Sequence, residues 1–326
     1  MKTIFAKAEE TGALAAAAKI LQAGGLVAFP TETVYGLGGN ALDAAACAKI
    51  YAAKGRPSDN PLISHVADLD MLKTVAAKIS EGAQILIKNF WPGPLTIIFP
   101  AANGGSVGVR MPANPIARRL IGLAGVPVAA PSANVSGGPS PTLAAHVLAD
   151  LDGKIDMIID GGPCEHGLES TVIDCTVTPA VILRPGSVTK EMIEAKIGPV
   201  AMATEAGSGP PKAPGMKYKH YAPAARLVVV TGAAANVERE ILRLAAAMGD
   251  AKFAILAADA AAYEGHSVLE MGRSAAEIGA NLFALLRKCD EMGLDAAIVE
   301  GVAEEGLGVA IMNRLKKAAS YNVVKA

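Results

Sequence analysis

Cysteine and aromatic residues are scarce in this chain of 326 residues, where Phe, Trp and Tyr together make up 4%. The four cysteines are scattered and show neither the CxxC nor the CxxxH spacing of a structural zinc site. They also form no disulfide framework of the kind found in small secreted domains. We therefore expect buried free thiols, and a core built mainly from Ala, Val, Ile and Leu. The cysteines are Cys47, Cys164, Cys175 and Cys289.

Neither sign of charge dominates, because 30 Lys and Arg face 31 Asp and Glu, giving a formal net charge of −1. This balance excludes the strong general attraction to polyanions of a basic chain, so a nucleic-acid contact would need a local patch. No stretch has about 18 consecutive apolar residues, and the first residues lack the apolar core of a signal peptide. We expect a soluble cytoplasmic protein without membrane contact.

Several catalytic motifs are also missing. The sequence has no G-x-x-x-x-G-K-S/T loop, no kinase signature set and no G-x-S-x-G elbow. ATP, if it binds, must bind without a P-loop. The scattered cysteines lack an evident His and Asp partner set, so covalent catalysis has little support. Positioning of the reactants must then account for the rate enhancement.

The alternation of apolar runs predicts an α/β protein with two domains. Across residues 1–200, strand-like and helical patterns intermingle, and several strand connections are too tight for a crossover, which predicts a mixed sheet. Residues 201–225 hold a Pro- and Gly-rich stretch without periodicity and predict a linker. Residues 226–326 alternate regularly and predict a smaller Rossmann-like α/β domain, although an intact G-x-G-x-x-G is missing.

The segment from Phe29 to Gly39 is the most informative motif. An apolar run ends at Pro30, and Thr31-Glu32-Thr33 and three glycines follow. The segment fits either a strand that delivers side chains to a ligand, with glycines that let backbone amides approach an anion, or an ordinary glycine-rich turn.

Six further polar clusters, each at the end of an apolar run, favour a ligand site over an isolated turn. They are Lys54-Gly55-Arg56-Pro57 with Asn60-Pro61-Leu62, Ser106 to Pro112, Ala130-Pro131-Ser132-Ala133-Asn134, Glu169-Ser170-Thr171, Arg184-Pro185-Gly186 and His220-Tyr221-Ala222-Pro223.

The cations in these clusters stand beside Pro or Gly at the edges of elements, where they can converge on a shared cavity. Lys54, Arg56, Arg110 and Arg184 together suit a polyphosphate and a second anionic reactant, although each could also be a surface or salt-bridged residue. His65 follows an apolar strand, and its position favours substrate orientation over general-base catalysis.

Two serines add neutral donors to this set. Ser132 and Ser140 stand beside Gly-rich sequence and suit phosphate oxygens, or are plain turn formers.

In their order and residue sequence, the clusters resemble the motifs of the threonylcarbamoyl-AMP synthase family. The resemblance is to the long Sua5-type members, which have a YrdC-like domain and a C-terminal Sua5 domain. The segment from Gly306 to Leu315 is similar to the closing signature of the latter. The resemblance covers nearly the whole chain. It implies a YrdC-like twisted mixed sheet with helices enclosing a cavity, followed by the smaller C-terminal domain.

The family's reaction is implied as well. L-Threonine and bicarbonate give N-carboxythreonine, whose carboxylate displaces pyrophosphate from the α-phosphate of ATP. Downstream tRNA threonylcarbamoyl-transfer proteins then use the product to modify adenosine 37 of tRNA, and a weak contact with tRNA itself is conceivable.

Site residues follow from the same resemblance. The set implied for L-threonine is Thr33, His65, Arg110, the backbone at Ala130, and Ser170. The set implied for ATP is Arg56, Asn60, Ser106, Ser132, Ser140, Arg184 and Tyr221. Lys54 is implied near the phosphates or bicarbonate and, with Arg56, as catalytic.

Two further expectations concern the metal and the linker. Mg²⁺ is expected to be held mainly by ATP phosphates, so none of the acidic candidates Glu32, Asp160, Glu169 and Asp174 is assigned as a ligand. The linker before Tyr221 is expected to close over the cavity as a lid, with a passive tether as the alternative.

Two other functions remain open from the residues. An RNA-binding module would also use a concave basic site, but it favours an extended basic strip with aromatic platforms, which this chain lacks. A carbamoyl-transfer or hydrolase activity would in some relatives need zinc or iron, and the required His and Cys spacing is missing.

Overall fold

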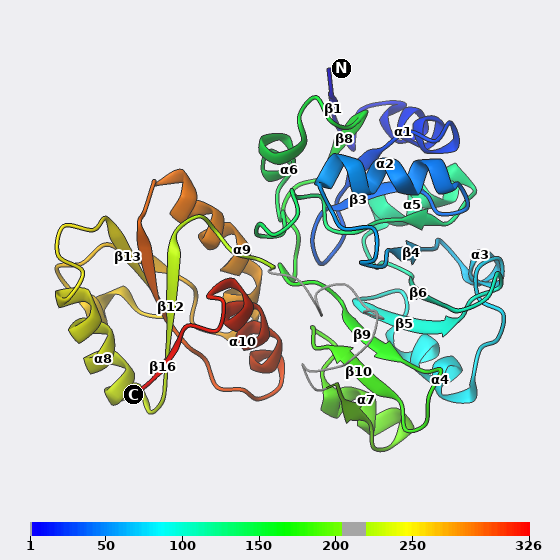
Figure 1. The fold of residues 1–326 in the computed structure, drawn as a ribbon. Coiled ribbons are helices and arrows are strands. Elements are labelled where there is room, and N and C mark those ends of the chain that lie inside the picture. The colour runs from blue at the N-terminus through cyan, green and yellow to red at the C-terminus, as the bar shows by residue number, and fades with distance from the viewer. Residues whose placement is uncertain (1, 204–219) are drawn as a thin grey trace. The chain divides into compact units, whose positions relative to one another are not determined.

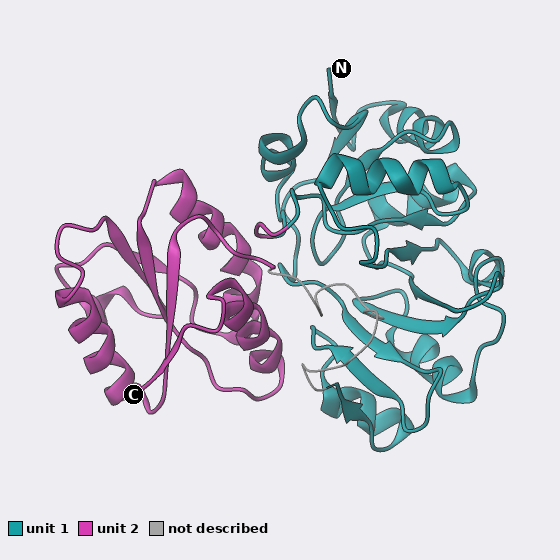
Figure 2. Cartoon of the chain, in the orientation of Figure 1, with its two compact units in different colours: residues 1–136, 140–217 teal, residues 137–139, 218–326 magenta. Residues whose placement is uncertain are grey.

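The computed structural model describes residues 2–203 and 220–326. Most of the predicted linker, and with it the proposed lid, lies outside the described residues. The chain divides into two compact units (Figure 2): residues 1–136 with 140–217 form unit 1, and residues 137–139 with 218–326 form unit 2. In the described part of the chain, none of the helices is long and apolar enough to cross a membrane.

Unit 1 is built on one mixed sheet of 11 strands. Parallel and antiparallel pairs alternate irregularly along it, as the tight connections predicted. In sheet order the strands are β1 (Ile4–Lys7), β8 (Met157–Asp160), β2 (Val27–Phe29), β3 (Gly36–Asn40), β7 (Val128–Ala129), β4 (Ile63–His65), β6 (Ser106–Arg110), β5 (Leu95–Pro100), β9 (Thr171–Asp174), β10 (Val181–Arg184) and β11 (Ala201–Met202).

A side chain caps the N-terminus of five helices of unit 1, and the clearest case is the helix that begins at Pro115. Asn114 accepts hydrogen bonds from the amides of Ile116 and Ala117, Pro115 is the first helical residue, and Gly125 ends the helix in the left-handed region. The helices are α1 (Ala13–Gln22), α2 (Ala44–Lys54), α3 (Leu69–Lys73), α4 (Glu81–Phe90), α5 (Pro115–Ala124), α6 (Ala144–Leu151) and α7 (Lys190–Ile197).

The first half of this sheet is covered by helices on both faces (Figure 1). Side chains alternate along β2, so Val27 and Phe29 pack with α1 and α5, while Ala28 packs with α2 and α6. This double cover explains why the strands here read as continuous apolar runs.

The second half of the sheet is covered by α3, α4 and α7 on one face. Ile97, Phe99 and Val109 point into that core. The intervening residues point to the opposite face, where the small apolar cluster of Ile98 and Val172 leaves room for polar side chains. The candidate site lies on this opposite face, which is called the open face below because α3, α4 and α7 cover the other one.

Unit 2 contains a separate parallel sheet of five strands. In sheet order they are β14 (Val268–Glu270), β13 (Phe253–Ala257), β15 (Ala296–Glu300), β12 (Arg226–Thr231) and β16 (Val323–Lys325). The helices are α8 (Ala234–Ala246), α9 (Ala275–Glu291) and α10 (Leu307–Ala318), with a 3₁₀ turn at Ala260–Tyr263. This architecture confirms the α/β fold class with a second, Rossmann-like domain.

The glycines after Tyr35 lie in a strand, which corrects the alternative of an ordinary glycine-rich turn. They belong to β3, which pairs antiparallel with β2 and β7. A Cβ on Gly38 would stand 2.7 Å from Phe29 Cε1 and 2.8 Å from Val128 Cγ1. The glycines are therefore required by close packing of side chains over the strand, which sequence alone does not distinguish from a need for flexible backbone.

This packing predicts a large cost for Gly38→Ala. The added methyl group must displace a buried ring and a buried valine, so unit 1 should lose about 1–3 kcal/mol of unfolding free energy. Denaturant unfolding followed by the fluorescence of Trp91, the single tryptophan, measures the change in unit 1. Gly82→Ala in α4 is the matched control, because its Cβ meets open space, and it should be neutral or stabilising. Equal stability of Gly38→Ala and wild type would contradict this account.

Candidate functional site

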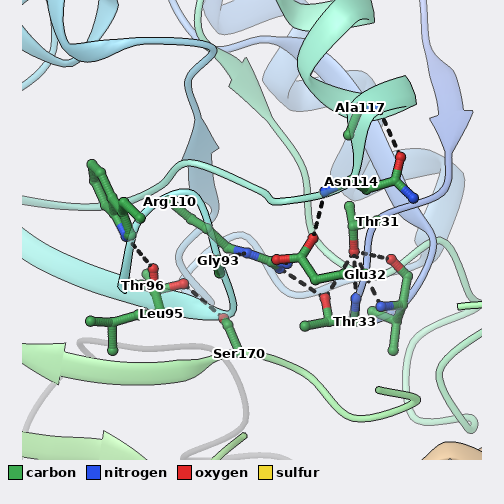
Figure 3. Close-up of polar contacts among 12 residues, drawn as sticks. Thr31, Glu32, Thr33, Gly93, Leu95, Thr96, Arg110, Asn114, Ala117 and Ser170 are labelled. Carbon is green, nitrogen blue, oxygen red and sulfur yellow. Dashed lines mark hydrogen bonds and ion pairs between the residues drawn. The ribbon is translucent and has the colours of Figure 1, made fainter. Parts of the chain in front are cut away.

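A buried ion pair joins the end of β6 to the turn after β2 (Figure 3). Arg110 Nη2 is 2.6 Å from Glu32 Oε1, and each side chain is only 5% exposed. Arg110 also donates from Nη1 to Thr33 Oγ1 at 2.8 Å and from Nε to the Gly93 carbonyl at 3.3 Å. The backbone amide of Asn114 donates to Glu32 Oε2 at 3.4 Å. One guanidinium thus ties the β2–β3 turn to the end of β6 and to the loop before β5.

The turn that presents Glu32 is closed by a threonine side chain. Thr31 Oγ1 donates to the Val34 carbonyl at 2.6 Å and accepts from the amides of Thr33 and Val34, both at 3.2 Å. These short-range bonds fix the direction of the two side chains that meet Arg110.

Burial and charge set the protonation of two groups beside Arg110. Burial raises the pKa of Glu32, but the charge and hydrogen bond of Arg110 outweigh it and hold this pKa below its ordinary value. Burial, with a smaller contribution from Arg110, lowers the pKa of His65 to about 3. His65 Nδ1 lies 3.2 Å from the Ile63 carbonyl, and the backbone of Val128 also hydrogen-bonds to the ring, so two backbone groups compete for the one proton of the neutral ring.

A second guanidinium cluster lies at the ends of β9 and β10. Arg184 donates from Nε to the Ser170 carbonyl at 3.1 Å and from Nη2 to Ser170 Oγ at 3.2 Å. The hydroxyls of Ser170 and Thr96 are 2.7 Å apart. Thr96 belongs to β5, which pairs with both β6 and β9, so the sheet places the Arg184 cluster beside that of Arg110.

Lys54 and Arg56 are buried cations that hold loops. Lys54 Nζ donates to the carbonyls of Ser132 and Asn134, both at 2.5 Å. Arg56 donates from Nε to the Asn60 carbonyl at 3.3 Å and from Nη2 to the Pro61 carbonyl at 3.0 Å. Both cations thus fix the loops that carry Ser132 and Asn60.

Three further residues of the sequence-derived sets also lie in unit 1. Ser140 donates to Glu169 Oε1 at 2.5 Å, and both are buried. Ala130 follows β7 and its amide donates to the Ile63 carbonyl at 2.9 Å, which places it beside the strand of His65. Ser106 is exposed at the start of β6, four residues and thus about 13 Å of strand from Arg110.

Tyr221, by contrast, lies in unit 2. Its ring packs against Phe283 with centroids 5.2 Å apart, and the Arg314 guanidinium lies 5.7 Å from the ring centroid. Tyr221 is 4% exposed and has a φ of 65°.

The structure also reveals polar residues that sequence reasoning missed. Glu32 and Glu169 were considered only as acidic metal candidates, yet they orient Arg110 and Ser140. Thr31 is named from the sequence only as part of the Phe29–Gly39 segment, and Thr96 is not singled out at all. Thr96 gives little signal because threonine is an ordinary strand residue, whereas Thr31 could have been found as a turn-closing residue after Pro30.

A cavity of about 540 Å³ lies elsewhere in unit 1, at the ends of β1 and β8. Lys7, Glu9, Arg119 and Asp160 line it among others, so cations and acids are balanced. Of the acidic metal candidates it includes Asp160, which accepts a hydrogen bond from the Gly162 amide at 3.0 Å. It contains none of the residues implied for L-threonine or ATP.

The buried ion pair predicts strong coupling between its members. Glu32→Gln or Arg110→Gln should each cost about 3–5 kcal/mol of unfolding free energy, because the remaining charge stays buried without its partner. The double variant should lose clearly less than the sum, since it leaves neither charge behind. Trp91-monitored denaturant unfolding of the four proteins gives the cycle, and additive losses would show that the pair does not act as a unit.

His65 predicts a pH dependence of stability. The pKa of His65 in the folded protein, about 3, lies below its ordinary value of 6.5. Between these two values the unfolded chain is protonated at this histidine and the folded chain is not. Its stabilising effect is complete above that ordinary value and falls as the pH drops toward 3. Lowering the pH from 7 to 5 should remove about 2 kcal/mol through this group.

Between pH 7 and 5 the contribution of Glu32 to stability is retained, because its ordinary pKa is 4.5 and its folded pKa is lower still. His65→Asn should reduce the loss of stability between pH 7 and 5, measured by Trp91 fluorescence. The same substitution at the exposed His266 is the matched control. An unchanged pH slope in His65→Asn would refute the assignment.

Two families match the chain along its length. The family described as "Telomere recombination", which groups Sua5, YciO and YrdC, matches residues 19–186, and the threonylcarbamoyl-AMP synthase C-terminal domain matches residues 188–320. The threonylcarbamoyl-AMP synthase of Pyrococcus abyssi is 48% identical over 95% of this chain and 94% of the relative. That of Bacillus subtilis is 45% identical over 96% of this chain and 94% of the relative.

A solved structure is similar over both whole chains. The crystal structure of P. abyssi Sua5 complexed with L-threonine has 46% sequence identity and a TM-score of 0.95, and the match covers 100% of each chain. Together with the two family matches, this similarity shows that the chain belongs to the Sua5/YrdC family of threonylcarbamoyl-AMP synthases.

Proposed function

We propose that this chain is an L-threonylcarbamoyladenylate synthase, a nucleotidyltransferase. It condenses L-threonine, bicarbonate and ATP to threonylcarbamoyl-AMP, pyrophosphate and water, for modification of adenosine 37 in tRNA by downstream transfer proteins. The observation that carries this proposal is the 48% identity, over 95% of the chain, to a protein named threonylcarbamoyl-AMP synthase. The structure titled as a complex of Sua5 with L-threonine supports the amino-acid substrate.

L-Threonine is proposed to bind at Thr33, His65, Arg110, Ala130 and Ser170. Glu32, Thr33 and the Gly93 carbonyl hold the Arg110 guanidinium in place using three of its five N–H groups, and a carboxylate is the ligand that such a fork prefers. The neutral ring of His65 would form a hydrogen bond with the substrate. This role fits orientation better than proton transfer, because a pKa of about 3 is far from the neutral range.

ATP is proposed to contact the loops held by the buried cations. Asn60 supports this, because it is 2% exposed and its Oδ1 has no hydrogen-bond partner in the described structure, so a ligand donor would satisfy it. Lys54 and Arg56 would add charge near the phosphates while fixing the loops. The full proposed ATP set remains Arg56, Asn60, Ser106, Ser132, Ser140, Arg184 and Tyr221.

Mg²⁺ is proposed to bind mainly through the ATP phosphates. Among the described residues, no group of three or more His, Cys, Asp or Glu could hold a metal ion. Glu32 and Glu169 already pair with Arg110 and Ser140. Such a cation needs few protein ligands and would supply charge neutralisation on the phosphates.

The proposed chemistry is a displacement at phosphorus without a covalent enzyme intermediate. The carboxylate of N-carboxythreonine forms a bond to the α-phosphorus of ATP, the bond to the bridging oxygen breaks, and pyrophosphate leaves. Arg110 and Arg184 would align and neutralise the two anions. Burial raises the pKa of Cys164 to about 12, which keeps the thiol beside the Thr31 turn protonated and a poor nucleophile.

The decisive assay is pyrophosphate release with ATP, Mg²⁺, bicarbonate and L-threonine. Pyrophosphate release should require both threonine and bicarbonate and should stop when the metal is chelated. A parallel assay with L-serine tests the alternative amino acid. Arg56→Ala should lower the rate by about tenfold to a hundredfold, the loss expected for a charged donor. Arg118→Ala on the exposed side of α5 is the matched control. Folded protein without threonine-dependent release would favour RNA binding instead.

A further inference from the structure

Thr96 is a fully buried hydroxyl on the open face of the sheet. It is 0% exposed, and Ser170 Oγ lies 2.7 Å from its hydroxyl (Figure 3). Its methyl group packs against the facing strand, where a Cβ on Gly108 would stand 3.4 Å from Thr96 Cγ2. Because a β-branched side chain has few rotamers, this packing fixes the hydroxyl toward Ser170.

Counting protons decides which hydroxyl donates. Arg184 Nη2 can only donate, so Ser170 Oγ accepts from it. Ser170 Oγ is also the polar atom that the Thr96 hydroxyl reaches within the described ranges. If Ser170 donated to Thr96, the buried proton of Thr96 would have no acceptor there, which is costly. Thr96 therefore donates, and both acceptor positions of Ser170 are filled.

We propose that Thr96 is a positioning residue that makes the Ser170 hydroxyl an obligatory donor to an oxygen of bound L-threonine. With Arg184 and Thr96 both donating to it, Ser170 has only its own proton left to offer a ligand. A carboxylate or hydroxyl oxygen accepts that proton, whereas an ammonium group cannot. This role rests on the proposed function, in which Ser170 contacts L-threonine.

The test is the KM for L-threonine in the pyrophosphate assay at saturating ATP and bicarbonate. Thr96→Val keeps the shape but removes the hydroxyl, and should raise this KM about tenfold with the KM for ATP unchanged. Thr96→Ser keeps the hydroxyl and should stay close to wild type. Thr3→Val is the matched control. Thr3 precedes β1, is also buried, and donates a hydrogen bond from its hydroxyl to the Ile155 carbonyl at 2.8 Å. It should leave both KM values unchanged.

A double variant separates positioning from a general loss of packing. If Thr96 acts through Ser170, Thr96→Val should change the KM little in a Ser170→Ala background. If Thr96→Val changes the KM for L-threonine equally in the wild-type and Ser170→Ala backgrounds, the role of Thr96 is overturned. A wild-type KM in folded Thr96→Val would overturn it too, and both results would leave the proposed function intact. Missing threonine-dependent release by wild type would overturn the proposed function as well. If Thr96→Val does not fold, Thr96→Ala removes the same hydroxyl for the same comparison.

Discussion

The ion pair of Arg110 and Glu32 is the interaction on which the open face of unit 1 depends. Each charge is almost completely buried, and neither would be tolerated there without the other. The pair joins a turn after β2 to the end of β6, two strands that are not neighbours in the sheet. It also sets the protonation of its surroundings, because the same guanidinium holds the pKa of Glu32 down and disfavours a charged His65.

The sheet explains why such a pair can exist. Helices cover both faces of its first half, and this rigid layer supports the turn that carries Glu32. In its second half helices cover one face, so alternate residues such as Thr96 and Arg110 point away from the apolar core. A strand pattern that reads as almost continuous apolar sequence therefore still delivers polar groups to a site.

Much of the fold could be predicted from the sequence, since the alternation of strand-like and helical apolar runs has a direct physical meaning. The glycines of β3 could not, because a glycine demanded by the ring of Phe29 looks like one demanded by a loop. The resemblance supplied Arg110 and Ser170, but their partners depend on pairing of distant strands. Glu32 thus appeared only as an acid of unassigned role, and Thr96 as an ordinary strand residue.

The ionisation of Glu32, His65 and Cys164 bears on the chemistry that this face of unit 1 can support. Burial keeps the Cys164 thiol protonated, and burial with Arg110 keeps His65 neutral, while Glu32 remains ionised. None of the three changes its proton count near neutral pH, so none is suited to shuttle protons in a catalytic cycle. What the face offers instead is fixed guanidinium and hydroxyl donors with assigned directions. Such donors suit a reaction in which both the nucleophile and the leaving group belong to the substrates.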